Sequence, residues 1–320
     1  MNRAWLEVKV AKKTVEALDV VSLELVSTDD SALPPFSAGT HIDVELPNGQ
    51  VRQYSLCNDA TETHRYLIGV LLDAGTRGGS KSVHHDVAVG STIRISEPRN
   101  HFQLVAAERS ILFAGGIGVT PILCMAERLA SSGAEFEMHY CARSRERTAF
   151  AGRLEASAFF PRVALHFDDG LQSQRLDAKA LLAAPASGAH LYVCGPTGFM
   201  DHVMKTAREQ GWLEESIHFE YFAGQTQAEG ASTGFQVKIA SSGRVIAVAA
   251  DQSVVAALNA HGIEVPVSCE QGVCGTCVTR VLDGVPDHRD MYFTEAEKIK
   301  NDQMTVCCSR ARSPLLVLDL

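Results

Sequence analysis

Apolar and polar residues alternate along the chain from its start to about Gln103. Leu6, Val8 and Val10 are separated by polar residues, and the same alternation returns at intervals as far as Ile93 and Ile95. A period of two places successive side chains on opposite faces of a strand. Several short alternating strands with turn residues between them predict a small antiparallel β-barrel.

The pattern changes at about Ser110, where short apolar runs begin to alternate with helix-like stretches. Helices are expected at 121–130 and 197–209. Strands are expected at 111–114, 136–140, 163–167, 190–194 and 217–220. Strands that alternate with helices imply right-handed crossovers and a parallel sheet.

A third pattern follows the stretch 223–233, which holds no large apolar residue and no aromatic residue, a composition typical of a flexible linker. Beyond it, strands are expected at 235–239 and 245–248 and a helix at 253–261. The chain therefore divides into three predicted domains. These are a barrel at 1–104, a nucleotide-binding domain with a parallel sheet at 105–226, and a cysteine-rich domain at 227–320.

Charge and hydropathy narrow the function classes. The net charge of -9 argues against a uniformly basic surface for nucleic acid. The first ten residues lack the apolar core of a signal peptide. No apolar run approaches the roughly 18 residues of a membrane span. We therefore expect a cytoplasmic protein.

The cysteines give the strongest chemical signal. There are nine in all, and in a reducing cytosol clustered cysteines indicate metal binding or catalysis more often than disulfides. Cys269, Cys274 and Cys277 form a C-x4-C-x2-C loop, and Cys307 follows later in the chain. Three thiolates on one loop and a fourth from elsewhere can hold a two-iron cluster. The alternative, structural zinc, usually uses C-x2-C pairs in two halves.

This loop, the strand–turn–strand–helix before it and the tail after it resemble a plant-type ferredoxin domain of β-grasp fold. In that family the fourth ligand follows the third at the separation seen here, which implies Cys307 rather than its neighbour Cys308. A shift of one residue would also turn the side chain to the opposite face of an extended segment. The resemblance thus implies four cluster ligands: Cys269, Cys274, Cys277 and Cys307.

A glycine-rich turn follows the apolar run at 111–114 and opens a helix. Small residues at a helix N-terminus let the backbone approach a pyrophosphate, although a plain strand–helix turn would look the same. The turn lacks the full G-x-G-x-x-G spacing of a Rossmann fingerprint. The residues predicted to bind a nucleotide here are Gly115, Gly116, Gly118, Thr120 and Pro121.

A second turn, Cys194-Gly195-Pro196, ends another predicted strand. Together the two turns resemble the pyridine-nucleotide domain of the ferredoxin–NADP reductase superfamily, which implies that Cys194 flanks the nicotinamide. Cys194 could instead be a small apolar residue at a strand end. For the adenosine end, Arg143 suits the phosphate of NADPH, whereas Asp168-Asp169 suit the ribose of NADH.

The segment Arg52-Gln53-Tyr54-Ser55 resembles the R-x-Y-S flavin motif of the same superfamily. Tyrosine gives a flavin an aromatic neighbour, the serine hydroxyl can hydrogen-bond near N5, and arginine supplies charge. The family's phosphate loop is matched by a cationic, glycine-rich segment that could also be a plain surface loop. The residues of that loop are Arg77, Gly78, Gly79, Ser80 and Lys81. Gly69, Val70 and Leu71 could present backbone groups to the ring.

The order barrel, nucleotide domain, ferredoxin resembles the phthalate dioxygenase reductase and vanillate demethylase reductase family of oxygenase reductases over essentially the whole chain. The resemblance implies FMN, NADH and a [2Fe–2S] cluster. It implies a monomer that passes electrons to a Rieske-type terminal oxygenase acting on an aromatic acid or aryl ether. It also implies that Ser55, Cys194 and Phe222 lie at the reacting groups. Two alternatives remain: a reductase for another monooxygenase, and a redox sensor without steady turnover.

Four acidic residues lie near the cysteines in sequence. They could dock a partner, or they could simply be a solvated rim, since charged residues are mostly exposed. They are Glu270, Asp283, Asp287 and Asp290.

Overall fold

The computed structural model describes residues 5–73, 75, 78–222, 233–267 and 269–320. It divides into two compact units, 1–220 and 221–320. The predicted linker at 223–233 lies almost entirely outside the described residues. Of the helices in these ranges, none has the length and apolar composition needed to cross a bilayer.

Within the described residues, seven strands of the first unit form one antiparallel sheet in the order β4-β3-β6-β1-β2-β5, with β7 paired to β3. Their bounds are β1 Trp5–Ala17, β2 Val20–Ser27, β3 Thr40–Glu45, β4 Val51–Ser55, β5 Tyr66–Leu71, β6 Thr92–Ser96 and β7 Arg99–Asn100. A bridge between Leu56 and Ile68 joins the two ends of this order. The inward residues of the alternation, such as Val8, Leu23 and Ile95, are almost fully buried, so the predicted barrel is confirmed.

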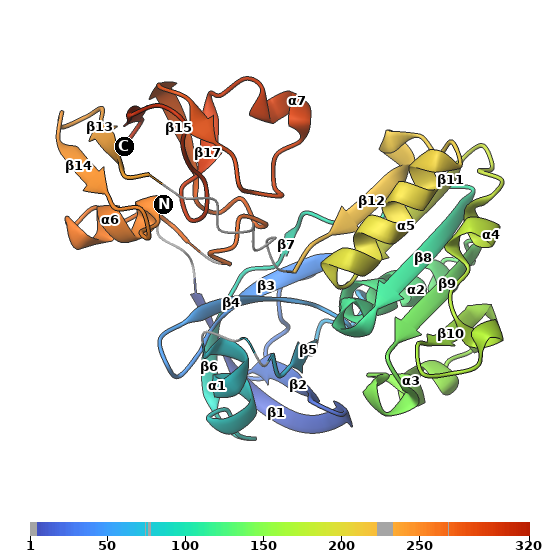
Figure 1. Ribbon diagram of the computed structural model, residues 1–320. Coiled ribbons are helices and arrows are strands. Elements are labelled where there is room, and N and C mark those ends of the chain that lie inside the picture. The colour runs from blue at the N-terminus through green and yellow to red at the C-terminus, as the bar shows by residue number, and fades with distance from the viewer. Residues whose placement is uncertain (1–4, 74, 76–77, 223–232, 268) are drawn as a thin grey trace. The chain divides into compact units, whose positions relative to one another are not determined.

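A five-stranded parallel sheet follows in the described part of the same unit, in the order β10-β9-β8-β11-β12. Its strands are β8 Arg109–Gly115, β9 Phe136–Ala142, β10 Val163–Phe167, β11 Ala189–Cys194 and β12 Ile217–Glu220. The α-helices of this region are α2 Val119–Ser131, α3 Ala151–Glu155, α4 Ala178–Leu182 and α5 Thr197–Glu209. Figure 1 shows α2 and α5 on opposite faces of the sheet.

The limits of several predicted elements in this sheet are confirmed at both ends, namely the strands 163–167 and 217–220 and the helix 197–209. The predicted helix at 121–130 begins earlier, at Val119. Pro121 falls in its first turn, where a missing N–H costs nothing because no intrahelical partner exists there. The helix can therefore start directly after the glycine turn.

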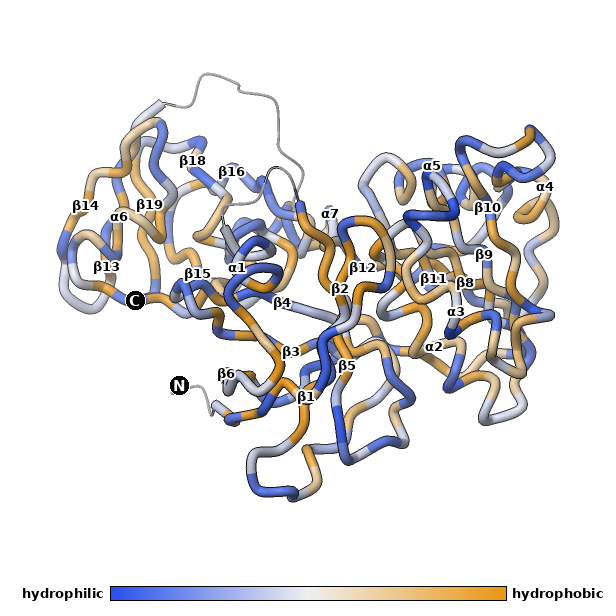
Figure 2. Tube along the Cα trace, turned by 90° about the horizontal axis from the view of Figure 1, so that it is seen from below, coloured by the Kyte–Doolittle hydropathy of each residue, from blue (hydrophilic) through white to orange (hydrophobic). Residues whose placement is uncertain are grey.

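One apolar core joins the barrel to the nucleotide sheet. Ala38, Cys57 and Phe102 of the barrel region pack in the same cluster as residues of α2 such as Leu123 and Met125. Figure 2 shows orange apolar segments along these strands and along α2, with blue polar segments mainly at the turns. The barrel and the parallel sheet therefore form one compact unit.

The second unit is built on a five-strand mixed sheet within the described residues, in the order β14-β13-β19-β15-β17. Its strands are β13 Phe235–Ile239, β14 Val245–Val248, β15 Val278–Asp283, β17 Gln303–Thr305 and β19 Leu315–Leu318, and β16 Pro286–Asp287 pairs separately with β18 Arg310–Ala311. The helices are α6 Val254–Ala260 and α7 Glu295–Lys298. Ser253 caps α6 by accepting a hydrogen bond from the Ala256 N–H. The buried core of this unit includes Cys277 and Cys307.

Candidate functional site

The predicted flavin strand is β4, and its pairing with β3 decides where each side chain points. Tyr54 lies opposite Ile42, and Ser55 lies opposite His41. Because neighbouring residues of a strand face opposite sides, Tyr54 packs against the barrel core while Ser55 faces the other way. The strand end thus offers an aromatic ring on one face and a buried hydroxyl on the other.

The predicted phosphate loop leads into α1, Gly79–His85. Gly78 has a φ of 108°, which favours glycine. A Cβ at Gly79 would lie 2.9 Å from Nε of Arg52, so the structure brings the predicted arginine and the predicted loop together. Behind the loop, Lys13 Nζ donates to three carbonyl groups at the end of α1, those of Val83, His84 and Val87.

The other residues of the predicted phosphate loop differ in their surroundings. Ser80 Oγ accepts a hydrogen bond from the Asp73 N–H at 3.1 Å, and Lys81 is exposed on α1. Arg77 lies outside the described residues. Contact of these residues with a flavin phosphate stays a prediction.

β5 carries Gly69, Val70 and Leu71, and Gly69 packs against residues of the nucleotide-binding region. A Cβ at Gly69 would lie 2.8 Å from Cγ2 of Thr120 and 3.0 Å from the Phe150 ring. The Val70 carbonyl accepts a hydrogen bond from His84 Nε2 at 3.0 Å. Gly69 therefore brings β5 directly against the start of α2.

The two predicted nucleotide turns touch one another through their backbones. A Cβ at Gly118 would lie 2.3 Å from the Cys194 carbonyl oxygen, and one at Gly195 would lie 2.8 Å from Cα of Gly115. Both turns follow neighbouring parallel strands, β8 and β11. The carboxyl edge of a parallel sheet is where such folds bind nucleotides. The two turns leave no space for a side chain at Gly118 or Gly195. Small residues at such turns allow a dinucleotide to approach the backbone closely.

A carboxyl group that the motifs did not single out completes this site. Ser55 Oγ donates a hydrogen bond to Oε2 of Glu220, the last residue of β12, at 3.2 Å. Burial raises the pKa of Glu220 to about 8 despite this hydrogen bond. Burial, with the nearby Glu220 carboxyl, also raises the pKa of the Cys194 thiol far above its ordinary value. Both groups are therefore mainly protonated and neutral at neutral pH.

His41 is a second residue that the sequence did not reveal. Its Nδ1 lies 3.8 Å from Oε1 of Glu220, and its Nε2 lies 3.0 Å from Nε2 of Gln53. Burial, helped by the nearby charge of Arg99, lowers the pKa of His41 to about 3. A neutral imidazole thus lies beside a neutral carboxyl group. No sequence signal connects His41 with Glu220, because the contact exists only once β3 and β12 are folded.

At the predicted adenosine end, Arg143 is exposed at the end of β9, and Asp168 and Asp169 directly follow β10. The Asp169 N–H donates to the Arg143 carbonyl oxygen at 3.2 Å. The arginine and the two acids therefore share one edge of the sheet. Their contact with a coenzyme stays a prediction.

In the second unit, the four predicted thiols are buried. Cys269 interacts with Cys274, and Cys307 interacts with both Cys277 and Cys308. The hydrogen bond with Cys269 lowers the pKa of Cys274 to about 5. In the described ranges no three histidine, cysteine or acidic side chains surround one point. Two thiolates for each of two irons is the donor set of a [2Fe–2S] cluster, so these residues fit that group.

Two glycines shape the cysteine loop. Gly272 and Gly275 have φ values of 73° and 69°. A Cβ at Gly272 would lie 2.3 Å from Sγ of Cys308, and one at Gly275 would lie 2.2 Å from the Tyr292 ring. The loop is therefore closely packed from both sides. Cys308 packs behind the loop, against Gly272.

The acidic residues near the loop differ from one another. Glu270 and Asp283 are exposed, and Asp287 is half-buried. Asp290 is buried, so both the docking hypothesis and the solvated-rim hypothesis are wrong for this residue. Its carboxylate accepts hydrogen bonds that face inward. Phe222 belongs to the second unit and is 37% exposed, and its role at the flavin stays a prediction.

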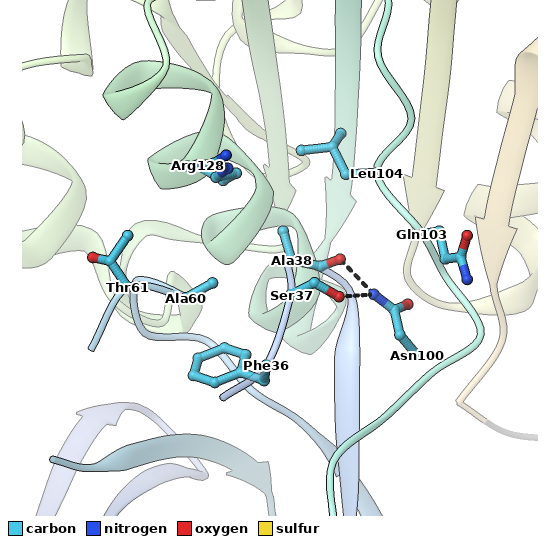
Figure 3. Close-up of a pocket in the computed structure, with 9 residues that line it drawn as sticks. All are labelled: Phe36, Ser37, Ala38, Ala60, Thr61, Asn100, Gln103, Leu104 and Arg128. Atoms are coloured by element: carbon cyan, nitrogen blue, oxygen red, sulfur yellow. Dashed lines mark hydrogen bonds between the residues drawn. The ribbon is translucent and has the colours of Figure 1, made fainter. Parts of the chain in front are cut away.

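The first unit also contains a cavity of about 360 Å³ away from these turns. Figure 3 shows Phe36, Ala60 and Leu104 around it, together with Arg128 on α2. Asn100 donates to Ser37 Oγ and to the Ala38 carbonyl oxygen along its wall. None of the residues predicted to bind flavin or nucleotide lines this cavity.

Comparison with known proteins bears on both units. Residues 237–312 match a family described as a 2Fe-2S iron-sulfur cluster binding domain. The chain is 56% identical over 316 residues to vanillate O-demethylase oxidoreductase of Pseudomonas sp. (strain HR199 / DSM 7063), covering 98% of this chain and 100% of the relative. It is 39% identical over 318 residues to phthalate dioxygenase reductase of Burkholderia cepacia, covering 99% and 98%.

Solved structures agree over the whole chain. A structure of phthalate dioxygenase reductase, described as a modular structure for electron transfer from pyridine nucleotides to [2Fe-2S], matches with a TM-score of 0.80 at 39% identity, covering 99% of this chain and 98% of that one. An intact type IV self-sufficient cytochrome P450 monooxygenase matches with a TM-score of 0.83 at 37% identity, covering 99% of this chain and 41% of that one.

Proposed function

Because the chain belongs to the family of phthalate dioxygenase reductase and vanillate O-demethylase oxidoreductase, we propose that it oxidises NADH and passes the electrons through FMN and a [2Fe–2S] cluster to an oxygenase. The observation that carries this function is that the four predicted thiols are all buried within the segment that matches a 2Fe-2S cluster binding domain. They lie in a chain whose first unit has the two touching glycine turns of a nucleotide site.

When bound, a flavin accepts a hydride and releases electrons singly, and the cluster carries one electron at a time. The turns at 115–118 and 194–196 would bind the coenzyme, because they lead into the starts of α2 and α5, where backbone N–H groups favour a pyrophosphate. The preference for NADH agrees with Asp168 and Asp169 at the edge of β10.

Within the barrel, Arg52 and the start of α1 would hold the flavin phosphate, because a cation and glycine amides favour an anion. Ser55 would present its hydroxyl at the reacting edge of the ring. Glu220 holds that hydroxyl in place by accepting a hydrogen bond from it. The neutral state of Glu220 at neutral pH would avoid placing a negative charge beside a bound flavin.

The acceptor is proposed to be a Rieske-type oxygenase acting on an aromatic acid or aryl ether, in keeping with the relative named vanillate O-demethylase oxidoreductase. We infer a monomeric reductase in the cytoplasm, where thiols stay reduced. The likeness to a self-sufficient cytochrome P450 supports a second acceptor class, a haem monooxygenase. Mixing the purified reductase with a vanillate-specific Rieske oxygenase or with a P450 haem domain, and measuring product formed per NADH, separates the two.

Anaerobic titration of the purified protein with NADH tests the central proposal, after chromatography of the released flavin. We expect FMN, bleaching of the flavin band and the EPR signal of a reduced [2Fe–2S] cluster. A flavin that bleaches while the cluster signal appears only with dithionite would contradict internal electron transfer. Absence of the cluster signal under both reductants would contradict the assignment of the four thiols.

A further inference from the structure

Asp290 differs from the other acidic residues near the cysteine loop because its side chain has no exposed surface, whereas that of Asp287 is 25% exposed. Buried carboxylates are uncommon and require partners that satisfy their oxygens. The role of Asp290 must therefore lie inside the unit, towards the residues that pack on it.

Both carboxylate oxygens of Asp290 accept hydrogen bonds. Its Oδ2 accepts a hydrogen bond from the Phe293 N–H at 2.9 Å, and its Oδ1 accepts one from the Ser309 hydroxyl at 3.1 Å. His288 Nδ1 lies 3.4 Å from Oδ1. Because both oxygens act as acceptors, the side chain suits the ionised form, which has only acceptor sites.

The same network reaches both segments that carry the thiols. Ser309, the partner of Asp290, lies two positions after Cys307, and its hydroxyl lies 3.0 Å from that of Thr305. On the other side, the Met291 N–H donates to the Gly272 carbonyl oxygen at 3.0 Å. A Cβ at Gly272 would lie 3.0 Å from Cα of Asp290, so the cysteine loop packs directly on this residue.

We propose that Asp290 is a positioning residue for the iron–sulfur centre: it ties the loop 269–277 to the segment 305–309, and its buried negative charge lowers the reduction potential of the cluster. The proposal rests on the proposed function, since it requires a cluster on the four thiols. Neither the docking hypothesis nor the solvated-rim hypothesis gives Asp290 this role.

The direction of the effect follows from electrostatics. Reduction adds one electron to the cluster, and a nearby fixed negative charge opposes that addition. In the poorly polarisable interior this repulsion is screened less than at the surface. Charges and hydrogen bonds around the cysteines are known to tune such potentials. A cluster of low potential loses its electron more readily to an acceptor.

The test compares Asp290→Asn with Asp287→Asn, measured by redox titration of the cluster EPR signal. Both variants remove one negative charge from neighbouring positions, but Asp287 is partly exposed and already pairs with Arg289 at 2.8 Å and Arg312 at 3.3 Å. We expect Asp290→Asn to favour the reduced cluster roughly tenfold, about 59 mV for a one-electron couple. We expect Asp287→Asn to change that equilibrium by less than about twofold, since screened surface charges contribute little.

Ser309→Ala provides a second test with the opposite sign, and it applies even if Asp290→Asn fails to fold. This variant keeps the Asp290 charge but removes a hydrogen bond that offsets it, so we expect the potential to fall. An unchanged potential in Asp290→Asn, or a raised or unchanged potential in Ser309→Ala, would overturn the proposal. The wild-type titration is the reference: if it shows no cluster signal, the proposed function has failed instead.

Discussion

The cysteine site of the second unit and the flavin–nucleotide site of the first unit are assembled in different ways. Three of the four thiols, Cys269, Cys274 and Cys277, lie on a single loop. In the first unit, the hydrogen bond between Ser55 and Glu220 joins residues 165 positions apart. A site built on one loop can be identified from spacing, whereas contacts made across a barrel and a sheet, such as that of Glu220 with Ser55, become visible only in the fold.

Cysteines of the two sites differ in their pKa values. The hydrogen bond between Cys269 and Cys274 lowers the pKa of Cys274, which favours its thiolate, and raises the pKa of Cys269. Burial raises the pKa of Cys194 and so keeps its thiol neutral. The direction of a cysteine's pKa shift therefore does not by itself identify a metal ligand, and the position in the motif is needed as well.

The largest expected effect concerns the fourth thiol. Cys307 is buried and hydrogen-bonds with Cys277, so Cys307→Ser should abolish the visible bands of the cluster and reduce bound iron to near zero. Flavin content should stay unchanged, because the flavin residues are predicted in the first unit. Absorption spectra and iron analysis measure both quantities.

Cys308→Ser is the matched control for this change. Cys308 neighbours Cys307 in sequence, but its Sγ lies 3.3 Å from Thr305 Oγ1 and packs against Gly272. We expect this variant to keep the cluster bands. If Cys308→Ser lost the cluster while Cys307→Ser kept it, Cys308 would be the fourth ligand. The motif would then have failed to identify the whole cysteine site, and the contrast with the flavin–nucleotide site would weaken.

Much of the fold was predictable because its elements have strong local patterns. The alternation through Val8, Leu23 and Ile95 reflects one buried face of the barrel, and the apolar runs of the parallel sheet reflect strands buried on both faces. Strand order was not predictable, because pairing such as that of β1 with β6 joins segments far apart in the chain. Its energy comes from tertiary packing, which no short window records.

The candidate sites were predictable to different depths for the same reason. Spacing predicted the three thiols of the loop and the family resemblance implied Cys307, and all four are buried, while their role as ligands stays a prediction. His41 and Glu220 were missed because each is an ordinary polar residue in its own strand. Asp290 was misjudged because acidic residues are usually exposed, and only the folded unit shows that Ser309 and Phe293 enclose it.

The next largest effect tests whether the fold-defined site is catalytic. Ser55→Ala removes the hydroxyl that Glu220 holds, so we expect NADH-dependent reduction of the flavin to slow by roughly 30-fold to 100-fold. Anaerobic stopped-flow absorbance measures this rate, and FMN affinity is measured separately. Ser131→Ala, at the exposed end of α2, is the control. Equal rates in both variants would leave Ser55 with only a structural role.

Glu220 should leave a signature in the pH dependence of stability. Its pKa is raised in the folded state from the ordinary 4.5 to about 8, so the folded chain holds this proton more tightly than the unfolded chain. Its contribution is therefore complete below pH 4.5 and is lost as the pH rises towards 8. Each pKa unit corresponds to about 1.4 kcal/mol. Partial solvent exposure reduces the expected loss to on the order of 2 kcal/mol.

Urea unfolding of the flavin-free protein, followed by tryptophan fluorescence at pH 5 and pH 8.5, measures this loss. Both tryptophans, Trp5 and Trp212, lie in the first unit and so report on it specifically. Glu220→Gln cannot ionise, and the stability difference between wild type and variant should change by about the stated amount between the two pH values. A difference that stays constant with pH would mean that Glu220 does not change its protonation on folding.

The contact between the two glycine turns predicts a smaller, more local effect. In Gly118→Ala the new Cβ would meet the Cys194 carbonyl at 2.3 Å, so the turns must separate. We expect the KM for NADH to rise about tenfold, because the coenzyme depends on their close approach. Gly133→Ala is the matched control, with nothing within 4 Å of the new Cβ. Its φ of 70° should cost about 1 kcal/mol of stability and leave the KM nearly unchanged. Equal KM values in the two variants would show that this contact does not contribute to coenzyme binding.

The smallest effect concerns the adenosine edge, where the sequence left the choice of residues open. Arg143 is exposed at the end of β9 and would contact only the non-reacting part of NADH. Loss of such a contact weakens ground state and transition state alike. Arg143→Ala should therefore raise the KM for NADH about threefold and leave kcat unchanged. Arg145→Ala is the control, because Arg145 already pairs with Glu155. Steady-state kinetics measures both quantities. A lower kcat at constant KM would show that this edge of the sheet acts on the reaction itself. The distinction between a binding edge and a reacting edge of the sheet would then be lost.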